Sequence, residues 1–185
     1  MPLGSPPLSS DHPRECSSAH DGWVSTVSSR VLPPWLRRAL ARPNWLYAHG
    51  LGGLLGRRFV QVTHVGRRSG RTFHTVVEVV GYDTTTGETT VVSGFGPRAD
   101  WLRNIEAAGG AQLDFGRGPS SAAYRRLSVE EATRVFAAYE RRNRPVRPVV
   151  NRVLSVLVGW RYDGSPAARR RLAETLPFLA FRPAR

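Results

Sequence analysis

Residues 59–80 read FVQVTHVGRRSGRTFHTVVEVV and contain the pattern that decides the fold. Apolar and polar residues alternate over 59–63, and β-branched residues dominate 73–80, so both ends of the stretch are typical of β-strands. Between them stand Gly66 and Gly70, which can adopt a positive φ in a tight turn. The stretch therefore predicts two antiparallel strands joined by a glycine-flanked turn.

The predicted turn is strongly basic, because it carries Arg67, Arg68 and Arg71. Guanidinium groups are forked donors that match phosphate and carboxylate oxygens, and glycines let backbone N–H groups face a ligand. A basic hairpin taken alone is more often a solvated turn than an anion site. Its interpretation therefore depends on the motifs that follow it.

Four more segments have the composition of strands: 89–93, 111–115, 121–127 and 176–181. Five or six short antiparallel strands can remove their exposed edges by closing into a small barrel. The sequence thus predicts an α+β fold, a barrel of about six mostly antiparallel strands with helices at its periphery.

Capping residues mark the peripheral helices. Asp100 is expected to cap a short helix over 101–108, and Gly109 to end it. Ser128 and Glu131 have the spacing of a capping box, which predicts the start of a longer helix. The remaining helices are predicted at 149–158, which stops at Gly159, and at 167–175, which follows Ser165-Pro166.

The N-terminal part of the chain has a different texture. Residues 1–30 are rich in Ser and Pro and poor in large apolar side chains, which predicts a disordered leader before a single domain over 31–185. Within 31–56, tryptophans and leucines alternate with arginines, which predicts two short amphipathic helices. These helices either cover an open end of the core, the commoner arrangement, or make a peripheral membrane contact with anionic lipid through residues 32–55.

The whole chain is basic, with a formal net charge of +13, and all 27 of its Lys and Arg residues are arginine. Such a surface favours a nucleic acid, an acidic lipid or a small anionic ligand, although a lysine-free composition also results from a GC-rich genome. The aromatic residues are interleaved with apolar ones, and no helix-turn-helix or RNA-binding signature occurs. Nucleic acid is therefore the least favoured of the three partners, and we expect none.

Composition also argues against several other classes of protein. Cys16 is the only cysteine, so no intramolecular disulfide can form, and the five histidines lack the spacing of metal ligands. We expect no metal site. Neither a signal peptide nor a membrane-spanning apolar run occurs, which predicts a cytoplasmic protein whose only membrane association would be peripheral.

Three motifs lie at the predicted strand ends: Gly66 to Gly70, then Val92-Ser93-Gly94-Phe95-Gly96, then Trp101-Leu102-Arg103-Asn104-Ile105. The second leaves room for a planar ring to approach the backbone, and the third begins a helix with free N–H donors. Together they suit an aromatic coenzyme with a phosphorylated tail. In this order and spacing they resemble the deazaflavin-dependent nitroreductase family, whose members are split β-barrels that use coenzyme F420. The resemblance is good over residues 58–127 and looser in the C-terminal third.

The resemblance implies a cofactor site residue by residue. The basic turn would bind the phosphate and the oligoglutamate tail, the strand and loop that follow would line the deazaflavin ring, and the helix would brace the cofactor. The implied cofactor-binding residues are Arg67, Arg68, Ser69, Val76, Val77, Val92, Ser93, Gly94, Trp101 and Asn104. The catalytic candidates are Ser93, near the polar edge of the ring, and Tyr139, whose phenol either donates a proton or belongs to the core with its hydroxyl at the rim.

The implied function is hydride transfer from reduced F420 to a small-molecule electron acceptor, namely a quinone, an enone or a nitroaromatic. The chain departs from the family's nitroreductase members at Phe73, at Val76-Val77 and at Glu78, where those members often carry a basic residue, Pro-Leu and a tyrosine. We interpret Glu78 as an outward-facing strand residue. Two alternatives keep the fold: an FMN-dependent split-barrel oxidoreductase, and a deazaflavin-binding protein without turnover. The oligomeric state, including a homodimer, stays open.

Overall fold

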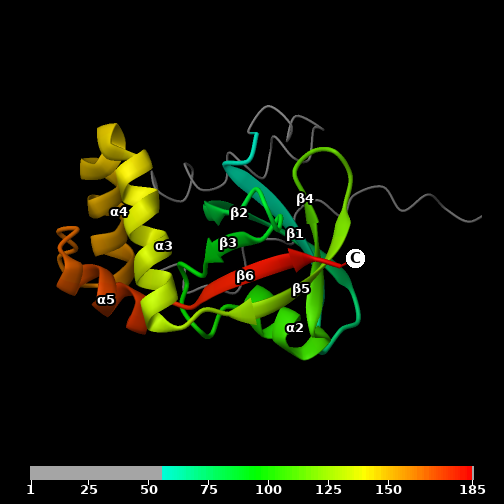
Figure 1. Ribbon diagram of the computed structural model, residues 1–185. Coiled ribbons are helices and arrows are strands. Elements are labelled where there is room, and N and C mark those ends of the chain that lie inside the picture. The colour runs from blue at the N-terminus through cyan, green and yellow to red at the C-terminus, as the bar shows by residue number, and fades with distance from the viewer. Residues whose placement is uncertain (1–55, 185) are drawn as a thin grey trace, which may run out of the picture.

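Six antiparallel strands close into a barrel in the computed structural model, which describes residues 56–184 (Figure 1). Around the barrel the strands follow the order β1-β2-β3-β6-β5-β4, and β4 pairs back with β1. The α+β barrel that the sequence predicts is confirmed. The strands are β1 (Phe59–Val65), β2 (Thr72–Tyr82), β3 (Thr89–Val92), β4 (Gly110–Asp114), β5 (Ser120–Arg126) and β6 (Phe178–Pro183).

The inside of the barrel is filled by alternate residues of its strands. In β1 the side chains of Val60 and Val62 are fully buried, whereas Gln61 between them is only half-buried. Helix α2 (Asp100–Ala108) adds Leu102 and Ile105, both fully buried, to the same cluster. The inward side chains, which recur at every second residue of the strand and on one face of α2, therefore pack into one apolar core.

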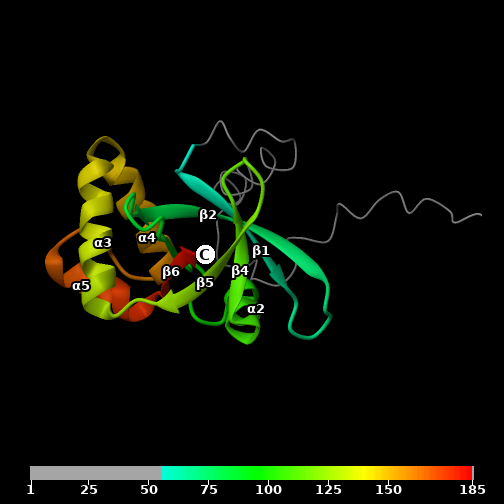
Figure 2. The same cartoon turned by 45° about the vertical axis from the view of Figure 1, so that its right-hand side comes forward.

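The other helices cover the outer face of β2, β3 and β6. They are α3 (Val129–Arg142), the short 3-10 helix η2 (Arg144–Val146), α4 (Arg147–Val158) and α5 (Pro166–Thr175), and α3, α4 and α5 gather on one side of the barrel in Figures 1 and 2. A second apolar cluster fills the junction, with Phe136 stacked on Tyr139 at 5.3 Å between ring centroids and edge-on to Phe178 at 5.8 Å. The sheet is thus covered on two sides, by α2 and by this helical layer.

Most of the predicted helix ends are confirmed. Ser128 and Glu131 form the capping box of α3, and Gly109 and Gly159 end α2 and α4 in the left-handed conformation. The prediction for Asp100 is wrong. The N-cap of α2 is Ala99, and Asp100 is the first helical residue.

Other boundaries move by a few residues. The closing strand β6 is Phe178–Pro183 rather than 176–181, because its register with β3 begins where Phe178 pairs with Val92. None of the helices among residues 56–184 is long and apolar enough to cross a membrane. The predicted leader over 1–30 and the amphipathic segment with its membrane contact over 32–55 lie outside the described residues.

Candidate functional site

The basic turn between β1 and β2 is closed by its own backbone. The N–H of Gly66 donates to the Arg71 carbonyl, and the N–H of Gly70 donates to the Gly66 carbonyl, both at 2.8 Å. Of the two glycines in this turn, Gly70 has a positive φ, +66°, and Gly66 does not. Gly66 is required for a different reason than predicted, because a Cβ there would lie 2.6 Å from the ring of Phe73.

Helix α2 fixes the first arginine of this turn. The Oδ1 atom of Asn104 accepts hydrogen bonds from the Arg67 backbone N–H at 3.1 Å and from its guanidinium at 2.9 Å. The Asp100 carboxylate accepts a third bond from the same guanidinium at 2.9 Å. Arg67 is therefore held by the helix, while Arg68, Ser69 and Arg71 are exposed and free to meet a ligand.

A buried histidine completes this connection. His64, inside the barrel, lies 3.2 Å from Asn104 through Nδ1 and 3.3 Å from the Thr75 hydroxyl through Nε2. Because the Asn104 amide donates to Nδ1, the neutral imidazole carries its proton on Nε2 and donates it to Thr75. Burial, followed by the nearby His74, lowers the pKa of His64 to about 4. His64 is neutral near pH 7 and keeps the amide of Asn104 oriented toward the turn.

Half of β2 has a free backbone edge. Strand β3 pairs with β2 only at Val79, Gly81 and Tyr82, with a bulge between Val79 and Gly81. The Val79 N–H donates to the Arg58 carbonyl, and hydrogen-bonded pairs alternate with non-hydrogen-bonded pairs along the antiparallel ladder between β1 and β2. The backbone N–H and C=O groups of Thr72, His74 and Val76 therefore point away from β1. Within residues 56–184 no strand pairs with that edge.

The loop after β3 begins beside this free edge. Ser93 is fully buried, and its hydroxyl donates to the Gly96 carbonyl at 2.9 Å, so the hydroxyl turns into the loop and away from a bound ring, whose polar edge it was expected to approach. Among residues 56–184 the backbone around it stays open, because a Cβ at Gly94 would meet Leu157, at 3.5 Å, and one at Gly96 would meet no described atom within 4 Å. The loop thus presents glycine backbone that the neighbouring described side chains leave open.

The predicted site residues divide into two groups. The structure joins the turn to the helix directly through Arg67 and Asn104, and the loop at Ser93 begins where the free edge of β2 ends. Other members are packed inside: Trp101 belongs to the barrel core and Val77 packs against it. Val92 packs against the helical cluster. Val76 lies on the outer face of β2, one residue beyond the inward-facing Thr75.

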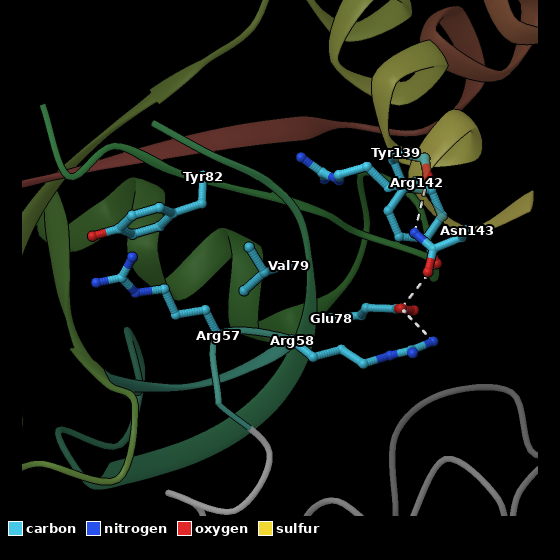
Figure 3. A pocket seen from close by; sticks show the side chains of 8 residues that line it. All are labelled: Arg57, Arg58, Glu78, Val79, Tyr82, Tyr139, Arg142 and Asn143. Atoms are coloured by element: carbon cyan, nitrogen blue, oxygen red, sulfur yellow. Dashed lines mark hydrogen bonds and ion pairs between the residues drawn. The ribbon is translucent and has the colours of Figure 1, made fainter. Parts of the chain in front are cut away.

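A cavity of about 260 Å³ lies at the other end of β2, next to the C-terminal end of α3. Glu78 lines it and accepts a hydrogen bond from the Tyr139 hydroxyl at 2.8 Å (Figure 3). The Arg58 guanidinium lies 3.5 Å from the same carboxylate oxygen. Glu78 is outward-facing as expected, but it is also a cavity residue with two partners.

Burial and the adjacent Glu78 raise the pKa of Tyr139, so its phenol stays protonated at every physiological pH. Its ring packs on Phe136 and is almost fully buried, and only the hydroxyl reaches the cavity. This is the arrangement in which Tyr139 belongs to the core with its hydroxyl at the rim.

Two further arginines line the same cavity, and sequence reasoning missed both. Arg57 stacks over the Tyr82 ring, with its guanidinium carbon 4.3 Å from the ring centroid. Arg142 donates to the Val80 carbonyl, at the bulge of β2, at 2.7 Å. Nothing in the sequence links positions 57 and 142, although Arg57-Arg58 directly ahead of a strand is a visible cluster.

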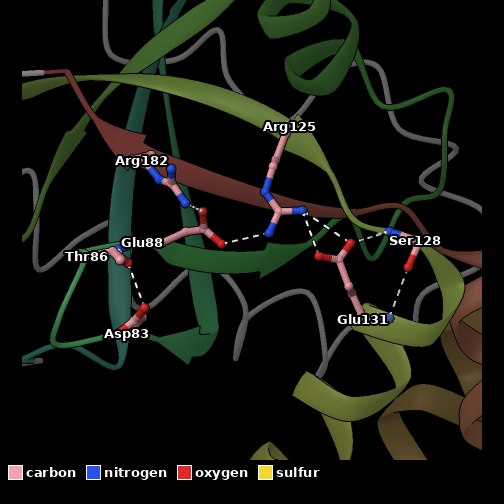
Figure 4. A network of polar contacts seen from close by, with 7 residues as sticks. All are labelled: Asp83, Thr86, Glu88, Arg125, Ser128, Glu131 and Arg182. Atoms are coloured by element: carbon pink, nitrogen blue, oxygen red, sulfur yellow. Dashed lines mark hydrogen bonds and ion pairs between the residues drawn. The ribbon is translucent and has the colours of Figure 1, made fainter.

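A second group of charges, outside the cavity lining, is fully paired. Glu88 accepts hydrogen bonds from Arg125 and Arg182, each at 3.0 Å, and Arg125 also donates to Glu131 (Figure 4). The network ties β3, β5 and β6 to the start of α3. Each arginine here has a carboxylate partner, which indicates a structural role.

No family model matches the chain, and no curated protein matches it. Solved structures that match the chain include an F420-H2-dependent reductase, at 17% identity and a TM-score of 0.39, covering 67% of this chain and 94% of that one. A pyridoxamine 5'-phosphate oxidase-related, FMN-binding protein from Nostoc punctiforme has 14% identity and a TM-score of 0.40, with 82% and 81% covered. A protein related to general stress protein 26, of the pyridoxinephosphate oxidase family, from Clostridium acetobutylicum has 10% identity and a TM-score of 0.42, with 79% and 84% covered.

Proposed function

We propose that the chain is an oxidoreductase that binds coenzyme F420 along the free edge of β2 and transfers hydride to a quinone, an enone or a nitroaromatic. The observation that carries this proposal is the backbone edge at His74 and Val76, which no strand among residues 56–184 pairs with, flanked by the basic turn and the glycine loop. A deazaflavin ring has N–H and C=O groups along one edge, and these pair with a strand edge as another strand does.

The residues around that edge have separate tasks in this proposal. Arg68 and Ser69 bind the phosphate and the first glutamates of the tail, while Asn104 and Asp100 act through Arg67 to hold the turn in place. Val76 lines the ring and pairs with its polar edge. Of the other implied residues, Val77, Val92 and Trp101 shape the walls from the core, and the backbone of Ser93 and Gly94 forms the facing surface.

When bound, the reduced cofactor supplies the hydride from its ring carbon. The chain orients the ring and shields it from water. The proton that the acceptor needs comes from solvent, because the Tyr139 hydroxyl already donates to Glu78.

A titration of the purified full chain with F420 and with FMN, followed by absorbance and fluorescence, tests the proposal. We expect saturable F420 binding and oxidation of reduced F420 by menadione. Arg68→Ala should weaken F420 binding about tenfold or more, because it removes one charge-assisted contact. Arg117→Ala, which removes the same charge from the exposed turn between β4 and β5, should not.

The other outcomes discriminate between the alternatives. A protein that is yellow on purification, or that binds FMN more tightly than F420, would indicate that the free edge of β2 binds FMN. F420 binding without reduction of any acceptor indicates a binding protein without turnover. No binding of either cofactor at micromolar protein would refute the proposal.

A further inference from the structure

We propose that the cavity between the residues just before β1, the C-terminal half of β2 and the end of α3 is a binding site for a small organic anion, a carboxylate or a phosphate ester. This site is separate from the proposed cofactor edge and does not depend on it. The cavity has a volume of about 260 Å³, which suits a small metabolite but not a whole coenzyme with its tail.

The first argument is the balance of charge at the cavity. Arg57, Arg58 and Arg142 line it, and Glu78 is its only lining acid among the described residues. Arg58 shares Glu78 with the Tyr139 hydroxyl. The three guanidinium groups and one carboxylate therefore leave an excess of about two positive charges, counted from formal charges.

The second argument is that two of these guanidinium groups are held by neutral partners. Arg57 is fixed by the ring of Tyr82, and Arg142 by the Val80 carbonyl. Within residues 56–184 neither has a carboxylate partner, in contrast to Arg125 and Arg182 in the paired network. A cation that is oriented but not neutralised is prepared to bind an anion, because little ordering remains to be done on binding.

The third argument concerns the conformation of β2. The bulge between Val79 and Gly81 interrupts the pairing with β3, and the Val80 carbonyl there accepts the hydrogen bond that positions Arg142. Figure 3 shows Arg57 and Arg58 leaving the start of β1 in opposite directions, one toward Tyr82 and the other toward Glu78. The arginines that line the cavity therefore stand on more than one side of it.

The full chain, free of cofactor, is titrated calorimetrically with inorganic phosphate, succinate and the neutral analogue succinamide at constant low ionic strength. We expect phosphate or succinate to bind at one saturable site with a dissociation constant below about 10 mM, and we expect no binding of succinamide. Binding of phosphate alone identifies a phosphate ester as the ligand chemistry, and binding of succinate alone identifies a carboxylate.

Variants that remove a positive or a negative charge from the cavity locate the site. Arg57→Gln and Arg142→Gln should each weaken anion binding about tenfold, whereas Glu78→Gln should tighten it severalfold because a repelling carboxylate is removed. The matched controls are Arg152→Gln on α4 and Glu130→Gln on α3, both exposed and outside the cavity, and neither should change the affinity.

Melting temperatures of all variants are recorded alongside. If Arg142→Gln does not fold after losing its contact with Val80, Arg57→Gln still decides the question, since the contact of Arg57 among residues 56–184 is with the face of Tyr82. The proposal is overturned if the wild-type chain binds no anion, if the control variants weaken binding as much as the cavity variants, or if Glu78→Gln weakens it.

Discussion

The buried His64 makes the stability of the barrel depend on pH in a predictable direction. Burial and the adjacent His74 lower its pKa in the folded state from 6.5 to about 4. Between these two pH values the unfolded chain binds a proton at this histidine and the folded chain does not, so the free energy of unfolding falls as the pH falls. The contribution of neutral His64 to the free energy of unfolding is fully present above about pH 6.5 and is lost as the pH falls toward 4.

The size of the effect follows from the shift. At about 1.4 kcal/mol per pKa unit, the whole shift corresponds to a loss on the order of 3 kcal/mol. Between about pH 7.5 and pH 5 the loss amounts to roughly 2 kcal/mol. The structural cause is that protonated Nδ1 no longer accepts the hydrogen bond from Asn104, and the cation stays buried in the barrel.

Urea denaturation at these two pH values measures the effect. The variant His64→Asn keeps an acceptor in place of Nδ1 but does not titrate, so it should lose about 2 kcal/mol less than the wild-type chain over this range. His74→Asn, at an exposed position, should keep most of the pH dependence. If the wild-type chain and His64→Asn lose stability in parallel, the lowered pKa of His64 is refuted.

Three further changes test other contacts. Gly66→Ala should destabilise the fold by about 1–3 kcal/mol in urea denaturation, because its Cβ would lie 2.6 Å from the ring of Phe73; an unchanged midpoint would contradict the close approach. Glu88→Gln weakens two ion pairs to partly exposed arginines, so we expect a loss of about 1 kcal/mol at low salt that shrinks in about 1 M salt. Tyr139→Phe keeps the aromatic packing but removes the hydrogen bond to Glu78, which should cost about 1–3 kcal/mol by the same assay; a neutral effect would mean that this bond contributes no net stability.

The local signals in the sequence predicted the elements well, because each depends on neighbouring residues. The capping box at Ser128 and Glu131 and the helix end at Gly159 are set within a single turn of helix. Asp100 was misjudged because its carboxylate has a competing partner, the guanidinium of Arg67, which folding brings next to it. A capping pattern cannot show that a distant cation will take the acceptor.

The candidate site was predictable only in part, for the same physical reason. The basic turn and the glycine loop are continuous stretches of chain, so their residue types reveal their chemistry. The free edge of β2 depends instead on where β3 stops pairing, and the bond between Glu78 and Tyr139 joins residues 61 positions apart. Contacts of this kind arise from strand register and helix packing, which single residues do not encode.

The position of β6 also sets an order of folding. This strand lies between β3 and β5, and it follows β5 in the chain only after α3, α4 and α5. Its pairing of Phe181 with Thr89 closes a long loop, whose entropy must be lost before the new ladder stabilises anything. We therefore expect barrel closure to be a late step, before which the edges of β3 and β5 would be open to pairing with another chain.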